Sequence, residues 1–247
     1  MTLEQFFKEV PRAALAFSGG TDSALLLWAA KTYGCDVRAY YVNTAFQPAF
    51  ELADAQKLAK ELEVPMTVVE ADVLAVPEAA VNGPRRCYYC KKALFTTLWK
   101  RAAEDGYTVL LDGTNASDDA GDRPGMQALR ELEVRSPLRE CGITKDQVRQ
   151  MSKEAGLFTW DKPAYACLAT RVPTGTAITR EALEKVERGE DALFKLGFTD
   201  FRVRLMGDAA RIQLPEAQME RAVQLHDTIA KALEVDFSAV LLDLKGR

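Results

Sequence analysis

The sequence predicts an α/β protein in which a doubly wound parallel sheet is followed by a smaller α+β domain. The first observation is an apolar segment, Ala13–Phe17, that has the character of a buried strand and runs through a turn into a helical segment. The second is the alternation of strand-like and helical segments, joined by short connections, as far as Gly113. The third is a loop containing proline and glycine after Ala164, beyond which the order of elements changes. We therefore expect one domain over residues 1–163 and a second over residues 164–247.

The elements of the first domain follow from the spacing of apolar residues. This spacing predicts strands over 13–17, 37–42, 66–70 and 108–113, and helices over 24–30, 49–62 and 89–105. In doubly wound sheets, ligands bind beyond the carboxyl ends of the strands. Ser18, Asn43 and Gly113 all fall at that edge, which predicts a ligand site there.

The second domain is predicted to be small and of the α+β type. After a loop over 171–176, we expect helices over 179–196 and 216–233 and strands over 201–205, 209–214 and 239–244. These segments form two βαβ-like pieces in a short stretch of chain, which favours a compact α+β arrangement.

The composition is that of a globular enzyme from a reducing compartment. The chain has 247 residues, of which 48% are hydrophobic and 28% charged, enough to bury a sizeable core. Its net charge of −4 argues against a broad nucleic-acid-binding face or an anionic membrane surface. We expect no signal peptide, because the first ten residues include acids and lack a long apolar run. The composition therefore favours a cytoplasmic protein with no nucleic-acid or membrane partner.

The turn at Ser18–Ser23, with the sequence S-G-G-T-D-S, has the chemistry of a phosphate site. Glycines let the backbone bend tightly and approach a ligand, and the first N–H groups of the helix favour an anion. The strand–S-G-G-x-D-S–helix unit resembles the signature of the PP-loop ATP pyrophosphatases, with their adenine nucleotide alpha hydrolase-like fold. The resemblance implies that ATP is cleaved between its α and β phosphates, so that the substrate is adenylylated and pyrophosphate leaves.

In this interpretation, pyrophosphate and Mg²⁺ are bound by Ser18, Gly19, Gly20, Asp22 and Ser23. Asp22 is the natural ligand for the hard cation, because Mg²⁺ prefers carboxylate oxygens. The adenine and ribose should lie across the strand ends, held by backbone groups between Asn43 and Phe46 and at Gly113.

The cysteines form a second constellation. Cys87 and Cys90 are three residues apart near the start of a predicted helix, so both sulfurs can reach one metal or cluster. Two thiols are too few for either, and Cys167, near the domain junction, is the natural third. Three thiolates leave one position open, as a catalytic or carrier centre requires. Cys35 and Cys141 are interpreted as thiols without a role.

Several motifs together resemble those of the LarE family. They are R-C-x-x-C-K at 86–91, L-D-G-T-N-x-x-D-D at 111–119, R-P-G at 123–125, A-C-L-A-T-R-x-P-x-G-T at 166–176, R-V-R at 202–204 and A-R-I-Q-L-P-E at 210–216. The resemblance covers nearly the whole chain. It implies an ATP-dependent sulfur transferase that matures the nickel-pincer nucleotide cofactor of lactate racemase. The implied substrate is pyridinium-3,5-biscarboxylic acid mononucleotide, whose carboxylates are adenylylated and then converted to thiocarboxylates.

The LarE family has two ways of supplying sulfur. In one, a single cysteine gives up its own sulfur and becomes dehydroalanine. Members with three cysteines instead resemble proteins that hold a [4Fe–4S] cluster, and Cys87, Cys90 and Cys167 place this chain with them. The single-cysteine members carry their sulfur one position from Cys167. This offset argues against sacrificial use of Cys167, which stays open as the alternative.

The resemblance also implies roles for charged residues. Lys91 adjoins the thiols, where a cation stabilises a transferring phosphate or a thiolate. Arg171, Arg202 and Arg204 are candidates for binding the substrate's phosphate and carboxylate, since guanidinium groups suit planar oxyanions. Arg202 and Arg204 are two residues apart on a strand, so their side chains share one face. The competing interpretation is that this face is a solvated surface without a binding role.

Three further candidates have weaker support. Glu190 matches a family carboxylate near the magnesium and substrate, with a surface role as its alternative. Asp118, Asp119 and Arg123 follow Gly113 on a loop where nucleotide or metal contact is expected. The single histidine, His226, is interpreted as a partly exposed helix residue.

Two other functions compete with this one. An ATP-dependent tRNA thiolase also combines a PP-loop with a C-x-x-C motif, but it needs a basic surface for RNA, which the net charge disfavours. A non-catalytic nucleotide-binding zinc protein would bind ATP without releasing pyrophosphate. We further expect a small-molecule nucleotide substrate and a homo-oligomer.

Overall fold

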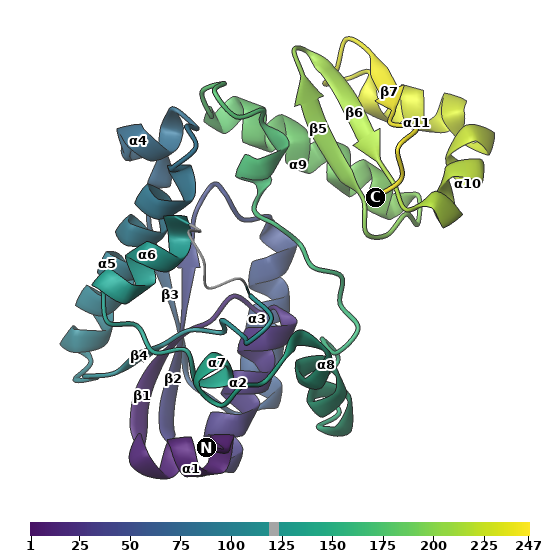
Figure 1. Cartoon of the computed structure of the whole chain (residues 1–247). Helices are drawn as coiled ribbons and strands as arrows, with labels where there is room; N and C mark the ends of the chain where they lie inside the picture. Colours follow the sequence, from purple (N-terminus) through teal and green to yellow (C-terminus); the bar gives the residue numbers. More distant parts are fainter. Residues whose placement is uncertain (119–123) are drawn as a thin grey trace. The chain divides into compact units, whose positions relative to one another are not determined.

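The computed structural model describes residues 1–118 and 124–247, which form two compact units (Figure 1). The larger unit comprises Met1–Val76 and Arg85–Lys162, and the smaller comprises Pro77–Pro84 and Pro163–Arg247. The sequence analysis assigned residues 77–84 to the first domain, whereas the structure groups them with the second. Each passage of the chain between the units has a proline at the boundary, and proline restricts the backbone there.

The larger unit is built on a four-stranded parallel sheet, which confirms the predicted α/β class. Its strands are β1 (Arg12–Ala16), β2 (Asp36–Asn43), β3 (Met66–Glu70) and β4 (Leu110–Leu111), in the order β3-β2-β1-β4. The predicted strand over 108–113 is only two residues long, because the chain leaves the ladder after Leu111. There the N–H of Asp112 bonds to the carbonyl of Arg135, which belongs to no named strand.

Helices cover both faces of this sheet. The larger unit contains α1 (Leu3–Glu9), α2 (Thr21–Thr32), α3 (Ala49–Glu61), η1 (Val73–Ala75), α5 (Arg86–Glu104), α6 (Pro124–Glu131), α7 (Pro137–Glu140) and α8 (Lys145–Glu154). Alternate residues of β1 and β2 pack into two cores, as strand geometry requires. Leu15 and Tyr41 join α1, α2, α3 and α8 on one face, and Ala14 and Tyr40 join α5 on the other.

Helix α2 is buried almost all round rather than along one stripe. Leu25, Leu26 and Leu27 are all fully buried, which accounts for its continuous apolar sequence. The helix begins three residues earlier than predicted, at Thr21, because Gly20 serves as its N-cap.

The smaller unit contains a three-stranded mixed sheet. Its elements are α4 (Pro77–Ala80), η2 (Leu168–Arg171), α9 (Arg180–Lys195), β5 (Arg202–Met206), β6 (Ala209–Gln213), η3 (Glu216–Gln218), α10 (Met219–Gln224), α11 (His226–Leu233) and β7 (Val240–Leu242). Val203 and Ile212 pack with Leu193 of α9 and Leu233 of α11 on one sheet face, so the predicted α+β character is confirmed. His226 is exposed at the start of α11, in agreement with its interpretation.

Two details of this unit differ from the prediction. Strands β5 and β6 pair antiparallel, so only β6, α10, α11 and β7 form a βαβ unit. The connection from Met206 to Ala209, through Gly207 and Asp208, is too short for a parallel crossover. In addition, the helix predicted over 216–233 is divided into η3, α10 and α11.

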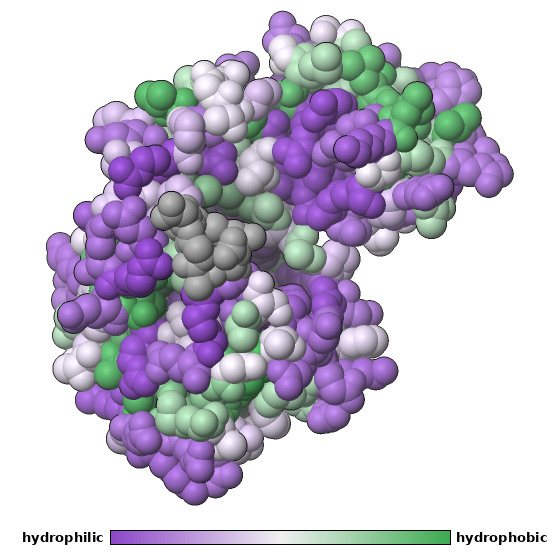
Figure 2. All heavy atoms as spheres, viewed as in Figure 1, coloured by the Kyte–Doolittle hydropathy of each residue, from purple (hydrophilic) through white to green (hydrophobic). Residues whose placement is uncertain are grey.

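The surface fits a globular protein. Hydrophilic residues cover much of the viewed face, with hydrophobic groups scattered among them (Figure 2). No helix in the described ranges 1–118 and 124–247 is long and apolar enough to cross a membrane.

Candidate active site

The turn between β1 and α2 is held in shape by its own hydroxyl groups. The hydroxyls of Ser18 and Ser23 lie 3.1 Å apart, and Ser23 Oγ donates to the carbonyl of Gly20 at 3.1 Å. Gly19 has φ +71°, and an added Cβ would lie 3.0 Å from the Cβ of Ala55, so this position requires glycine. Since no side-chain bond caps α2 at Gly20, its first N–H groups are available to an anion.

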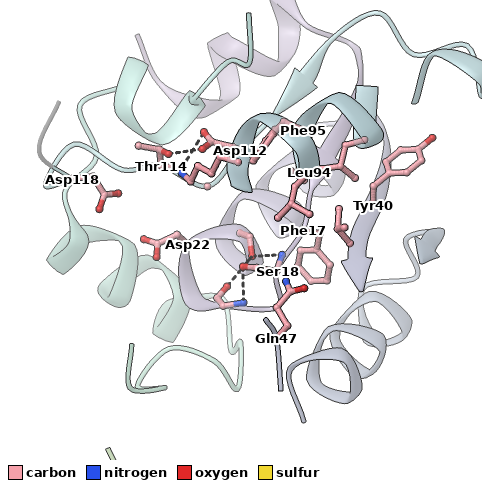
Figure 3. A pocket seen from close by; sticks show the side chains of 17 residues that line it. Phe17, Ser18, Asp22, Tyr40, Gln47, Leu94, Phe95, Asp112, Thr114 and Asp118 are labelled. Atoms are coloured by element: carbon pink, nitrogen blue, oxygen red, sulfur yellow. Dashed lines mark hydrogen bonds between the residues drawn. The ribbon is translucent and has the colours of Figure 1, made fainter. Parts of the chain in front are cut away.

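The turn opens onto a cavity of about 340 Å³ in the larger unit (Figure 3). One part is apolar, and Figure 3 shows Phe17, Tyr40, Leu94 and Phe95 there. The other part carries the polar groups, namely Ser18, Gly20, Asp22, Ser23, Gln47, Lys91, Asp112, Thr114 and Asp118. This division suits a nucleotide, with an apolar slot for the base and polar groups with N–H donors for the phosphates.

Gly113 lies against the start of α2. A Cβ at this position would lie 2.9 Å from the backbone nitrogen of Ser23, so only glycine allows the loop after β4 to come so close. The preceding Asp112 is buried and accepts a hydrogen bond of 2.6 Å from Ser136 Oγ and one of 3.3 Å from the backbone N–H of Thr114. These contacts hold the loop that forms one wall of the cavity.

Asp22 is held by two partners that the sequence analysis did not identify. Its Oδ1 accepts a hydrogen bond of 2.9 Å from Asn115 Nδ2, and its Oδ2 lies 2.5 Å from Lys145 Nζ. Asn115 also connects to Asp118, whose Oδ2 accepts its backbone N–H at 3.0 Å. Asn115 belongs to the motif L-D-G-T-N-x-x-D-D, which the sequence analysis identified. Lys145 belongs to no such motif, and only the tertiary structure brings it to Asp22.

Asn43 does not line the cavity. Its side-chain amide donates to both carboxylate oxygens of Glu70 at 3.0 Å, linking the ends of β2 and β3. The turn that follows brings Gln47 to the cavity instead, since the N–H of Gln47 bonds to the carbonyl of Thr44 at 3.1 Å. Val42 and Gln47 are thus the residues by which this strand end lines the cavity, and the role expected of backbone groups between Asn43 and Phe46 stays a prediction.

The C-x-x-C motif lies on the first turn of α5, next to the cavity. Residues four apart on a helix share a face, which aligns Cys87 with Lys91 and Cys90 with Leu94. Lys91 and Leu94 line the cavity. Cys87 is exposed, with Sγ 3.6 Å from Arg86 Nη2. The two thiols therefore stand one helical turn before the residues that face the nucleotide cavity.

In the smaller unit, a buried ion pair holds the segment that carries Cys167. The side chains of Arg171 and Glu190 are 0% and 2% exposed, with Nε–Oε1 at 2.7 Å and Nη2–Oε2 at 3.1 Å. Arg171 Nη1 also donates to the carbonyl of Ala166 at 2.7 Å, and Glu190 accepts the N–H of Val203 at 2.9 Å and the hydroxyl of Tyr165. The surface alternative for Glu190 is therefore wrong.

This pairing also changes the expectation for Arg171. Its guanidinium is buried and its donors bond to Glu190, to the carbonyls of Ala166 and Cys167 and to the hydroxyl of Thr170. Because these donors are already occupied, the guanidinium of Arg171 is not available to bind the substrate directly, as the sequence analysis had expected. It instead fixes the backbone at the start of η2, where Cys167 is the N-cap.

Arg202 and Arg204 share one face of β5, on the opposite side from the core. Arg202 is buried and donates to the carbonyls of Phe201 and Ala164, both at 2.5 Å. Arg204 is half-buried and donates to Gln213 Oε1 and to the carbonyl of Thr170, also at 2.5 Å. Burial, and then repulsion by Arg171, lower the pKa of Arg202 to about 10 and also lower the pKa of Arg204. An anion near these groups would offset the part of this lowering that comes from repulsion by Arg171.

Two groups of predicted residues need separate mention. Asp119 and Arg123 lie outside the described residues. Cys87 and Cys90 belong to the larger unit and Cys167 to the smaller. Within the described parts of the chain, no set of three or more His, Cys, Asp or Glu side chains is gathered in the manner of a metal site.

Comparison with known proteins agrees with this site. A family model for the queuosine biosynthesis protein QueC matches residues 12–81. An uncharacterized protein of Synechocystis is 40% identical over 99% of this chain and 92% of its own length. The pyridinium-3,5-bisthiocarboxylic acid mononucleotide synthase of Lactiplantibacillus plantarum is 36% identical over 99% of this chain and 90% of its own length. The chain belongs to the LarE family.

Membership of the LarE family confirms that the chain is an ATP-dependent sulfurtransferase with a PP-loop. A more distant similarity is to a tRNA-specific 2-thiouridylase of Clostridium botulinum, 23% identical over 71% of this chain and 60% of that protein. The residues that line the cavity come from the PP-loop, from β2 and the turn after it, from the loop after β4 and from α5.

The thiols should differ strongly in reactivity toward iodoacetamide. Cys87 is exposed beside Arg86, whereas Cys35 is buried and burial raises its pKa to about 11. Since the thiolate is the nucleophile, alkylation at pH 8 should modify Cys87 well before Cys35. Mass spectrometry of peptides from protein quenched at increasing times measures the order. Equal rates for Cys35 and Cys87 in the folded protein would contradict the burial of Cys35.

Proposed function

We propose that this enzyme adenylylates a carboxylate of pyridinium-3,5-biscarboxylic acid mononucleotide with ATP and converts it to a thiocarboxylate. The observation that carries the proposal is the face of α5, where Lys91 lines the nucleotide cavity and Cys87 and Cys90 occupy the preceding turn. Groups suited to activation and groups suited to sulfur transfer thus project from one helix. The relative named for the bisthiocarboxylic acid product supplies the identity of the acceptor.

The adenylylation step follows from the cavity. The base would occupy the apolar part, and the β and γ phosphates would lie at the N–H groups that begin α2. A carboxylate oxygen of the acceptor attacks the α phosphorus, the bond from that phosphorus to the bridging oxygen breaks, and pyrophosphate leaves with the electron pair. Asp22 would hold Mg²⁺, which neutralises charge on the phosphates, and Lys91 would stabilise the charge that develops in this step.

The acceptor is an anion, and the smaller unit offers cationic groups for it. Arg202 and Arg204 occupy one sheet face, and burial, followed by repulsion from Arg171, lowers their pKa values. A phosphate or carboxylate there would relieve this repulsion, which supports their role in binding the acceptor. Arg171 and Glu190 act as positioning residues, because their contacts fix the segment around Cys167.

For the sulfur source, we propose that Cys87, Cys90 and Cys167 hold a [4Fe–4S] cluster. The donors suit this group, since thiolates are its usual ligands and Cys87 and Cys90 project from neighbouring positions on α5. When bound, the cluster supplies an iron atom that has no protein ligand and can carry sulfur. The proposal requires the two units to present their thiols to the same adenylate. In the alternative, Cys167 loses its own sulfur and becomes dehydroalanine.

The reaction itself tests the proposal. Anaerobically purified protein, first analysed for iron, sulfide and zinc, is given ATP, Mg²⁺, sulfide and the pyridinium dicarboxylate mononucleotide. We expect AMP and pyrophosphate, and more than one thiocarboxylate per chain. Formation of ADP and phosphate would overturn the adenylylation step, and binding of ATP without pyrophosphate release would favour a non-catalytic protein.

Cysteine variants separate the two sulfur sources. Replacing Cys87, Cys90 or Cys167 singly with alanine should remove iron and sulfur transfer but leave acceptor-dependent release of pyrophosphate. Cys141→Ala, which changes a free thiol outside the proposed cluster ligands, is the matched control. A dehydroalanine at Cys167 by intact-mass spectrometry, with no more than one sulfur delivered per chain, would instead establish the sacrificial route.

The second candidate is a tRNA thiolase, favoured by the weaker similarity to a 2-thiouridylase. The net charge of −4 argues against it, because RNA binding relies on cationic contacts with phosphate. Filter binding of bulk tRNA at low salt distinguishes the two, and we expect none above the level of an acidic control protein. We also propose a cytoplasmic homo-oligomer, whose subunit number light scattering measures.

A further inference from the structure

Lys145 pairs with Asp22, which lines the cavity, and a well-ordered local structure holds its backbone. It is the first residue of α8, whose capping box joins Thr144 and Gln147. Its backbone N–H donates to Ser117 Oγ at 2.9 Å, and Val148 on the same helix is fully buried in the core. The backbone of Lys145 is therefore fixed, and its ammonium group reaches across to Asp22 Oδ2 at 2.5 Å.

The pair formed by Lys145 and Asp22 is easily exchanged for other partners. Their side chains are 30% and 26% exposed, and an ion pair this accessible contributes only about 0–1 kcal/mol. Asp22 lines the cavity, and its carboxylate oxygens are the hard ligands that a divalent cation prefers. A divalent cation at Asp22 would therefore replace the ammonium group of Lys145. A nucleotide bringing its cation to Asp22 would thus release Lys145 next to the phosphates, at little cost.

We propose that Lys145 binds the pyrophosphate portion of ATP, exchanging its apo partner Asp22 for the β and γ phosphates. This inference rests on the proposed function and adds a residue to it. When the bond from the α phosphorus to the bridging oxygen breaks, the electron pair moves to pyrophosphate. Lys145 keeps its proton throughout and neutralises the charge that this leaving group acquires. Lys91 of α5, which lines the cavity, is then not the only cation that serves the phosphates.

The competing explanation is that Lys145 only neutralises Asp22. Isothermal titration calorimetry with pyrophosphate and with AMP, both in the presence of Mg²⁺, separates the two explanations without turnover. For Lys145→Met, we expect pyrophosphate affinity to fall about 10- to 100-fold, since a charge-assisted bond is lost, while AMP affinity is unchanged. Lys145→Arg should retain most of the affinity. Lys153→Met removes an exposed lysine from the same helix and should leave both affinities as they are.

A second background makes the result decisive. In the Asp22→Asn variant, position 22 carries no charge for Lys145 to neutralise. If Lys145 were only a counterion for Asp22, replacing it in this variant would not change pyrophosphate affinity. We expect Lys145→Met to weaken pyrophosphate binding in that background as well. An unchanged pyrophosphate affinity on adding Lys145→Met, or an equal loss of AMP affinity, would overturn the proposal. If the unmodified protein bound neither pyrophosphate nor ATP, the proposed function itself would be wrong.

Discussion

Arg171→Leu should destabilise the smaller unit by about 3–5 kcal/mol, because it leaves a buried carboxylate without its cation. Glu190 would keep only the N–H of Val203 and the hydroxyl of Tyr165, and the carbonyl of Ala166 would lose its donor. The loss appears as an earlier urea unfolding transition of the part of the chain that contains the smaller sheet. Sulfur transfer should fall with it, since the backbone at Cys167 is no longer fixed.

A surface ion pair in the same unit provides the control. Arg188 and Asp236 also form a charged pair, at 2.6 Å, but the Arg188 side chain is 55% exposed. Arg188→Leu should therefore cost no more than about 1 kcal/mol. The double variant Arg171→Leu with Glu190→Leu should recover part of the lost stability, because no unpaired charge stays buried. Similar unfolding midpoints for Arg171→Leu and Arg188→Leu would contradict the stabilising role of the buried Arg171–Glu190 pair.

Asp22→Ala should reduce formation of AMP and pyrophosphate by at least about 100-fold. The change removes the carboxylate that faces the phosphate end of the cavity, together with the charge stabilisation that depends on it. Quantifying AMP and pyrophosphate with saturating ATP and acceptor measures the loss. Thermal stability should change by no more than about 1 kcal/mol, since the pair with Lys145 is partly exposed.

Asp146→Asn is the matched control for Asp22. Asp146 is an exposed carboxylate on α8, next to Lys145 in sequence and outside the residues that line the cavity. Adenylylation should be unaffected by this change. If Asp22→Ala retained the unmodified rate, or lost activity only through unfolding, the phosphate end of the cavity would lie elsewhere.

Much of the architecture followed from local patterns in the sequence. Apolar runs predicted β1 and β2, because strands buried on both faces need apolar side chains on both, and Met66, Val68 and Val69 predicted the edge strand β3. The S-G-G-T-D-S turn and the helix after it were correct as well, since glycine geometry and helix-terminal N–H groups are local properties. Spacing along α5 likewise placed Cys87, Cys90 and Lys91 near the start of one helix. The sequence by itself thus determined the fold class and the turn that opens onto the cavity.

Only the tertiary structure decided the partners of the charged residues. Arg171 and Glu190 lie 19 residues apart and pair in a buried site, while Asp22 and Lys145 meet across 123 residues. Such pairings depend on how helices pack and on how far each side chain is desolvated. Neither property produces a periodic pattern of residues that could be recognised in the sequence. The same holds for β5 and β6, whose antiparallel pairing depends on a short turn between them. Motifs describe residues close along the chain, whereas desolvation and long-range pairing arise only when distant segments come together.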